Sequence, residues 1–132
     1  MIALLLPLLA LAGPERTHDI SPEDYFTLAG IYDVDIAPDG DRVLWSESRW
    51  EEAKGRRRTD LWLVGMDGDD PTRLTFGPSG GWAPSWSPDG RFVYYLSSAE
   101  EPGVDRAPWD GSTQVYRLDP ATGSAVPITS AE

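Results

Sequence analysis

Short runs of apolar residues, each bounded by turn residues, fill the chain from about residue 31 to its end. Runs this short that are rich in Val, Trp and Tyr are typical of β-strands. The pattern predicts eight strands, over residues 33–36, 43–45, 61–64, 73–75, 83–86, 92–96, 115–118 and 126–129.

The predicted strands belong to a repeat. Residues Ala37–Trp45 (APDGDRVLW) recur fifty residues later as Ser87–Tyr95 (SPDGRFVYY). Two later segments repeat at an offset of fifty-four: residues 59–62 recur as 113–116, and residues 74–75 as 128–129. Only the intervening loop lengthens, so the chain holds two units of about fifty residues, a period typical of propellers and solenoids.

Each unit contains Pro-Asp-Gly, at residues 38–40 and 88–90. Pro presets φ at the first corner of a turn, Asp suits the second, and Gly takes the left-handed conformation that closes a hairpin. Each unit is therefore expected to form four antiparallel strands.

The predicted fold class is all-β: two four-stranded antiparallel blades of an incomplete β-propeller, preceded by a signal peptide and a short helix. Blade 1 is expected over residues 31–80 and blade 2 over 81–132, with the chain ending before the remaining blades and any hydrolase domain. Two meanders in a small sandwich are the alternative. Two blades cannot close a ring, so we expect apolar end faces and marginal stability for this chain alone.

Residues 13–30 are expected to be a linker and a short helix over residues 22–29. Ser21 can cap that helix, Pro22 fits its first position, and Asp24 stands where a capping box needs an acid. Gly30 is the expected stop.

Residues 1–12 read as a signal peptide, with an apolar run too short to span a bilayer. Ala10 and Ala12 supply small residues before a cleavage site at Gly13, although no Lys or Arg precedes the run. A buried helix is the alternative, which Pro7 disfavours. The expected location is secreted or periplasmic, with no membrane contact after cleavage.

The formal net charge is −11, which argues against nucleic acid, because phosphate binding needs a basic surface. There is no cysteine, so the chain can form neither a disulfide nor a thiolate nucleophile.

Trp86-Ser87-Pro88-Asp89-Gly90 and the strand after it resemble the repeat shared by the Tol-system periplasmic propeller and prolyl oligopeptidase-family peptidases. Residues 20–26, 33–40 and 43–45 resemble the opening of bacterial peptidases of the acylaminoacyl-peptidase and dipeptidyl-aminopeptidase kind. Residues 58–64 with 73–75 resemble the first blade of the same family.

This resemblance implies a parent serine peptidase in which the propeller gates access of short peptides to a Ser-His-Asp triad on a later α/β-hydrolase domain. No catalytic, cofactor-binding or metal residue is carried over to this chain, no cofactor is expected, and the oligomeric state stays open. The rival function is a non-catalytic periplasmic propeller that, like the Tol-system protein, acts as a protein-binding module.

Several residues imitate functional motifs. Ser79 stands in Gly77-Pro78-Ser79-Gly80-Gly81, a G-x-S-x-G match, but a loop between two blades lacks the strand and helix of a nucleophile elbow. His18, the only histidine, is expected to be a surface residue near the mature N-terminus.

The remaining acidic motifs are interpreted as surface features. Glu51-Glu52 is expected in a solvated loop, and Asp67, Asp69 and Asp70 in a plain turn rather than a calcium loop. The longest loop, residues 97–112, carries Trp109 and could contact a substrate or the hydrolase domain.

Overall fold

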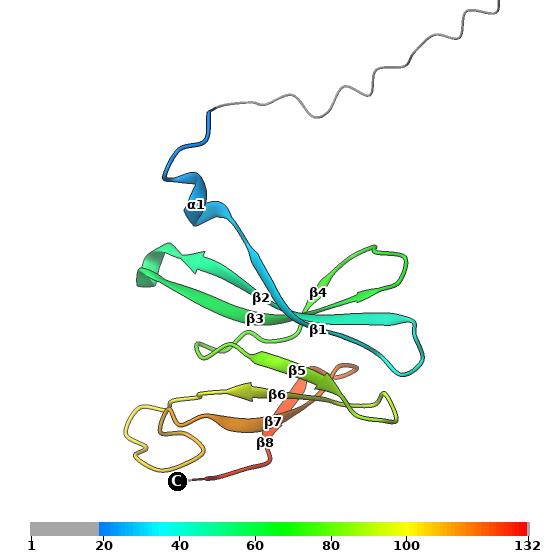
Figure 1. Cartoon of the computed structure of the whole chain (residues 1–132). Helices are drawn as coiled ribbons and strands as arrows, with labels where there is room; N and C mark the ends of the chain where they lie inside the picture. Colours follow the sequence, from blue (N-terminus) through cyan, green and yellow to red (C-terminus); the bar gives the residue numbers. More distant parts are fainter. Residues whose placement is uncertain (1–18, 132) are drawn as a thin grey trace, which may run out of the picture.

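A computed structural model describes residues 19–131 (Figure 1). The N-terminal elements are the short helix α1 (Asp24–Thr27), then β1 (Gly30–Ile36), β2 (Arg42–Glu51), the 3-10 turn η1 (Glu52–Lys54), β3 (Arg56–Gly65) and β4 (Thr72–Arg73). The second half holds β5 (Trp82–Trp86), β6 (Val93–Ser97), β7 (Gln114–Asp119) and β8 (Ser124–Pro127). Within residues 19–131, no helix is long and apolar enough to cross a membrane.

The strands form two separate four-stranded sheets, ordered β1-β2-β3-β4 and β5-β6-β7-β8. Every pairing is antiparallel, and each strand lies beside its neighbour in sequence. The edge strand β5 packs against β1, β2 and β3, which places the second sheet face to face with the first (Figure 1). The predicted all-β architecture of two antiparallel four-stranded units is confirmed.

The Pro-Asp-Gly segments form the same turn in both sheets. Gly40 and Gly90 have φ values of 78° and 68°, the left-handed region that glycine adopts without strain. Their amides donate to Ala37 O (2.8 Å) and Ser87 O (2.9 Å), respectively. The side chain of Arg42 crosses to the second turn, where it lies over the Trp86 ring and donates to Gly90 O (3.2 Å).

A β-bulge also repeats. The register shifts between Tyr32 and Asp35 in β1, and between Trp82 and Ser85 in β5. Asp33 and Ala83, fifty residues apart, both have positive φ, 47° and 49°. The repeated sequence therefore encodes the same local backbone twice, including a strained residue that sequence pattern alone does not reveal.

The core lies between the two sheets. Leu44 and Leu61 of the first sheet are fully buried, as are Val93 and Leu118 of the second. We call the face of the first sheet that packs against the second sheet its front, and the opposite face its back. In the second sheet, the face that packs against the first sheet is its back. Leu44 and Leu61 lie on the front of the first sheet and pack against the back of the second.

The two back faces correspond position by position. The back of the second sheet carries the Tyr95–Tyr116 ring pair, with centroids 5.5 Å apart, covered by the first sheet. The same positions of the first sheet carry Trp45 and Trp62, stacked at 6.4 Å. Within the described chain no sheet covers this second pair, so the back of the first sheet is an aromatic face without a neighbouring sheet.

A threonine two residues after the last strand of each unit bonds to the third strand. Leu61 N donates to Thr75 Oγ1 (3.0 Å), and Val115 N donates to Thr129 Oγ1 (2.9 Å). Each hydroxyl in turn donates to the same position of the third strand, Asp60 Oδ1 (3.0 Å) in one sheet and Gln114 Oε1 (2.7 Å) in the other.

We expect Thr75→Val to lower the free energy of unfolding by about 1–3 kcal/mol, because it leaves the buried Leu61 amide without an acceptor. Thr129→Val is the matched control, because Thr129 is exposed and water can replace its hydroxyl. Urea unfolding of both variants checks the prediction, and equal losses at the two sites would contradict it.

Three expectations about element bounds are wrong. The helix is one turn, Asp24–Thr27, instead of residues 22–29, because Leu28 is already extended with ψ of 133° and Gly30 starts β1. The side chain of Ser21 does not cap it; the Ser21 amide instead donates to Asp24 Oδ2 (2.6 Å).

The hairpin of β2 and β3 is also longer than predicted, since their pairing continues without a break from Arg42↔Gly65 to Glu51↔Arg56. The fourth strands start earlier than predicted: β4 is Thr72–Arg73 and β8 is Ser124–Pro127. The predicted signal peptide, residues 1–12, and His18 lie outside the described residues.

Candidate functional site

Two cavities open between the sheets, on the side where the long loop 98–113 meets the 77–81 connection. The larger, about 630 Å³, is lined by Arg56, Arg57, Arg58 and Trp82 among others, and we call it the arginine-lined cavity. The smaller, about 390 Å³, is lined by Tyr95, Tyr116, Trp109, Glu100 and Glu101 among others, and we call it the tyrosine-lined cavity. Pro78, Ser79 and Glu100 line both.

Two of the three arginines are committed to structural contacts. Arg57 donates to the carbonyl oxygens of Leu28 (3.3 Å) and Ser48 (3.2 Å), and its guanidinium lies 5.3 Å from the centre of the Tyr25 ring. It therefore ties α1 to the first sheet. Arg58 pairs with Asp60.

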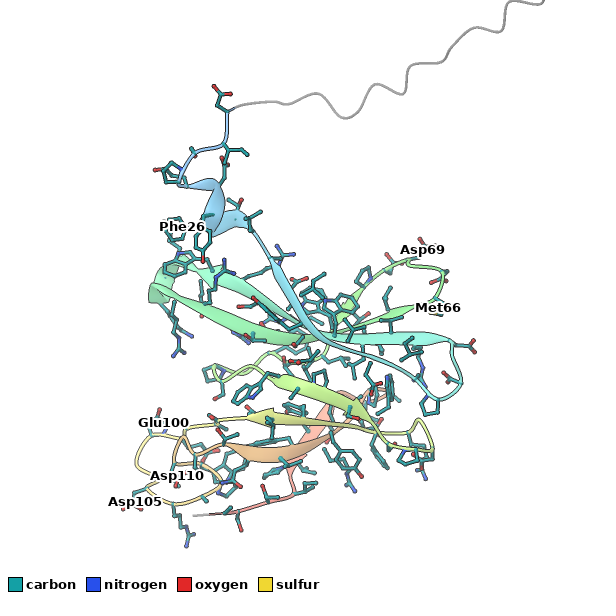
Figure 2. All side chains as sticks on the ribbon, viewed as in Figure 1. Phe26, Met66, Asp69, Glu100, Asp105 and Asp110 are labelled. Carbon is teal, nitrogen blue, oxygen red and sulfur yellow. The ribbon has the colours of Figure 1, made fainter. Side chains whose placement is uncertain are left out.

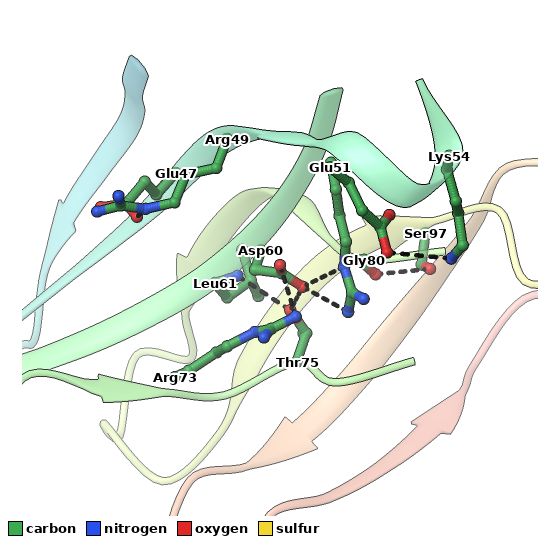
Figure 3. Close-up of polar contacts among 11 residues, drawn as sticks. Glu47, Arg49, Glu51, Lys54, Asp60, Leu61, Arg73, Thr75, Gly80 and Ser97 are labelled. Carbon is green, nitrogen blue, oxygen red and sulfur yellow. Dashed lines mark hydrogen bonds and ion pairs between the residues drawn. The ribbon is translucent and has the colours of Figure 1, made fainter. Parts of the chain in front are cut away.

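Asp60 is the centre of a polar network on the back of the first sheet (Figure 3). Its Oδ1 accepts from Arg58 Nη2 (3.0 Å) and Thr75 Oγ1 (3.0 Å), and its Oδ2 accepts from Arg73 Nη2 (2.7 Å). Glu47 and Arg49 form a neighbouring ion pair (Figure 3). A carboxylate that accepts from two arginines and a threonine is a structural group.

The structure places Ser79 in the connection between β4 and β5, where the sequence predicted a loop rather than a nucleophile elbow. No helix follows it: Gly80 has φ of 62°, and β5 begins at Trp82. No histidine lies within residues 19–131, so Ser79 has no imidazole base in the part of the chain that the structure describes.

The other acidic motifs separate in space. Glu51 ends β2 and pairs with Lys54 at 3.4 Å, so it does not lie in a loop as expected, whereas Glu52 begins the η1 turn. Asp67 accepts from the Asp69 amide (3.3 Å) within the turn after β3, and Figure 2 shows Asp69 well away from Glu100, which lines both cavities. Within the described ranges, no group of three or more His, Cys, Asp or Glu is arranged to hold a metal ion.

Loop 98–113 is folded back on itself and packs on the core. Glu100 and Asp110 form an isolated antiparallel bridge, and the Glu101 amide donates to Trp109 O (2.9 Å). The Trp109 ring packs edge to face on Tyr116 with centroids 6.2 Å apart. Trp109 is therefore a wall of the tyrosine-lined cavity, which the sequence did not predict.

Sequence reasoning also missed two acids that join the sheets. Asp35 Oδ2 accepts from the Trp86 amide (2.9 Å), and Asp33 Oδ2 accepts from the Ala83 amide (3.3 Å) and from Ser46 Oγ (3.1 Å). The sequence did carry a signal for these contacts. One predicted strand holds two acids at the positions where the second unit has Ala83 and Ser85.

Burial raises the pKa of Tyr95 to about 12, with a smaller contribution from Tyr116. Burial, and then the charge of Glu101, also raises the pKa of Tyr116. In the unfolded chain a tyrosine ionises near pH 10, whereas folded Tyr95 stays neutral. Its contribution to stability is therefore complete below about pH 10 and is lost as the pH rises toward 12.

Between pH 10 and 12, we expect the free energy of unfolding of the wild type to fall by about 1–2 kcal/mol more than that of Tyr95→Phe. Urea unfolding at several pH values measures this difference. Tyr32→Phe, at a position 57% exposed, is the control and should keep the wild-type slope.

The chain is similar in sequence to parts of several known proteins. Residues of the chain are 25% identical to dipeptidyl-peptidase 5 of Porphyromonas gingivalis over 87 residues, 66% of this chain and 13% of the relative. They are 27% identical to the peptidase YuxL of Bacillus subtilis over 110 residues, 83% of this chain and 15% of the relative. The Tol-Pal system protein TolB of Nitratidesulfovibrio vulgaris is 40% identical over 65 residues, 48% of this chain and 14% of that protein. No protein-family model matches the chain.

Solved structures support the fold. The AtxE2 isopeptidase matches with a TM-score of 0.65 at 18% identity, over 85% of this chain and 20% of that one. A TolB protein from Agrobacterium tumefaciens matches with a TM-score of 0.53 at 25% identity, over 75% of this chain and 33% of that one. The chain folds as two β-propeller blades. The first sheet is one blade and the second sheet the next.

The predicted resemblance to the propeller portion of bacterial peptidases is confirmed by these relatives. The chain spans only 13% and 15% of the length of the two peptidases that it matches. Membership of the prolyl oligopeptidase family and the predicted division of the chain into segments stay predictions.

Proposed function

We propose that this chain is the N-terminal propeller part of a secreted serine peptidase that hydrolyses short peptides, and that the propeller gates access of substrates. The observation that carries the proposal is sequence similarity to two peptidases along a chain folded as two blades. The described residues of the blades supply no Ser–His pair, since residues 19–131 contain no histidine. Their role in the proposal is to restrict which peptides reach the nucleophile.

The geometry supports gating in one respect. β1 and β5 are edge strands of their sheets, and they contact each other. Blades that converge along one edge place the axis of a ring beside that edge, and the opening of a closed ring there is narrow. A narrow opening admits an extended peptide and excludes a folded protein.

The first test is to sequence the gene beyond the codon for Glu132 and to treat the full-length product with a fluorophosphonate. We expect further Pro-Asp-Gly blades, then a strand, G-x-S-x-G and a helix, with Asp and His later, and covalent labelling of that Ser. A frame that carries blades alone, or a product that is not labelled, contradicts the peptidase function.

Gating has its own test in the full-length enzyme. With peptides of increasing length that share one cleavage site, kcat/KM should fall sharply once the peptide is long enough to fold, and a folded protein with that site should resist cleavage. An enzyme that cleaves the folded protein as fast as the short peptide is a peptidase without a gate.

Secretion is tested separately. We expect mature protein in the periplasm or the medium to begin at Gly13, as N-terminal sequencing would show. Protein that retains Met1 in the cytoplasm contradicts the proposed signal peptide.

A second function is favoured by the TolB similarity, which is the highest identity among these relatives, 40% over 65 residues. In this alternative the chain belongs to a non-catalytic periplasmic propeller that binds other proteins. It predicts blades without a hydrolase domain and no fluorophosphonate labelling, so the first test separates the two functions.

A further inference from the structure

The tyrosine-lined cavity combines aromatic walls with uncompensated negative charge. Its walls are the rings of Tyr95, Trp109 and Tyr116, with Tyr116 in contact with both of the others. Of the described residues that line it, only Glu100 and Glu101 are charged. Within residues 19–131, neither carboxylate has an ion pair or a hydrogen bond.

The carboxylates lie at the rim. Both glutamates are exposed, and Figure 2 shows Glu100 at the surface of loop 98–113. The backbone bonds of that loop, Glu100 with Asp110 and the Glu101 amide with Trp109 O, hold the acids beside the aromatic wall. Two acids fixed next to a ring cluster form an electrostatic trap for a cation and repel anions.

A second observation comes from the wall itself. The Tyr116 side chain is 5% exposed, and its hydroxyl has no hydrogen-bond partner among the described residues. Buried hydroxyl groups in proteins almost always have a partner, so the Tyr116 hydroxyl favours a polar ligand group in this cavity. The Glu101 carboxylate is close enough for its charge to act on this phenol.

The volume and lining limit the ligand. About 390 Å³ lies at the small end of the range for small-molecule sites, roughly 300–1,000 Å³. Leu74 and Phe76 add apolar surface, which suits a hydrocarbon stem, and aromatic ring faces attract ammonium groups.

We propose that the tyrosine-lined cavity binds a small organic cation, an ammonium group carried on an apolar stem. The stem packs against the three rings, and the ammonium group lies between the rim carboxylates and the ring faces. This site needs no catalytic domain, so it is independent of the proposed peptidase function. The arginine-lined cavity does not compete for such a ligand, because its charged lining is mostly basic.

The test titrates the full chain with 2-phenylethylammonium and, as a neutral partner of nearly the same shape, 2-phenylethanol. The indole N–H signal of Trp109, assigned by its loss in Trp109→Phe, reports binding in ¹H–¹⁵N spectra. We expect a saturable shift with the ammonium compound and a dissociation constant about five- to tenfold lower than that for the alcohol.

Charge variants separate the rim acids from general electrostatics. Glu100→Gln with Glu101→Gln should weaken binding of the cation about five- to tenfold and leave binding of the alcohol unchanged. The matched control is Glu52→Gln with Asp105→Asn, which removes two exposed carboxylates that do not line the cavity. These four side chains are exposed, so both double variants should fold, and far-UV circular dichroism checks that they do.

The proposal is overturned if neither ammonium compound gives a saturable shift, if the alcohol binds as tightly as the ammonium compounds, or if both double variants weaken binding equally. Quaternary benzyltrimethylammonium added to the same titration distinguishes the two cation types. Binding of either type supports the site, and the tighter one identifies the head group that it prefers.

Discussion

Gly80→Ala is expected to lower the free energy of unfolding by about 3–5 kcal/mol, enough to leave much of the chain unfolded at 25 °C. A Cβ at this position would lie 2.0 Å from the carbonyl oxygen of Thr59, and the φ of Gly80 is +62°. Neighbouring bonds fix the backbone here, because Gly81 N donates to Thr59 O (2.9 Å) and Ser97 Oγ donates to Gly80 O (3.0 Å).

Two glycines provide matched controls for that substitution. Gly103 has φ of +82° with open space around it, so Gly103→Ala measures the backbone strain without the clash. Gly77 has neither constraint, and Gly77→Ala should change the free energy of unfolding by less than about 0.5 kcal/mol. Urea unfolding ranks the three, and a Gly80→Ala loss no larger than that of Gly103→Ala contradicts the tight passage between the blades.

The second large effect is expected at Tyr95. Tyr95→Ala should cost about 3–5 kcal/mol, because this ring is 6% exposed and is covered by the first blade. Trp45 occupies the same position of the first blade, yet no blade covers it within the described chain. Trp45→Ala should therefore cost less, about 1–2 kcal/mol, although the tryptophan is the larger side chain.

The comparison between Tyr95→Ala and Trp45→Ala is made first in this chain and then in the full-length protein. If another blade packs on Trp45 there, as the proposed propeller requires, the cost of Trp45→Ala should rise to that of Tyr95→Ala. Near-UV circular dichroism during unfolding measures both. An unchanged cost in the longer protein contradicts the proposal that the back of the first blade is covered.

The sequence predicted the repeat, the eight strands and the Pro-Asp-Gly turns because these depend on local patterns. The turn needs Gly40 and Gly90 at fixed positions, and apolar runs mark the buried strands. Strand ends were predicted less well, since polar residues such as Arg56 and Arg57 pair as readily as apolar ones once a hairpin is registered.

The cavities were beyond sequence reasoning. Tyr95, Trp109 and Tyr116 lie on two strands and a loop, and only the return of loop 98–113 onto the second blade brings them together. Trp109 was interpreted as a possible contact for substrate, but its ring packs on Tyr116. Ser79 could be excluded as an elbow nucleophile from sequence because three glycines and a proline surround it.

The positional match between the two back faces has a genetic consequence. Each unit carries one surface that fits the unit before it and another that fits the unit after it, so a single junction chemistry serves the whole array. An in-frame duplication of about fifty codons therefore adds a blade without requiring a new contact between blades to evolve. Recombination between such copies can change the number of units in one event, and selection then acts on ring closure rather than on each interface.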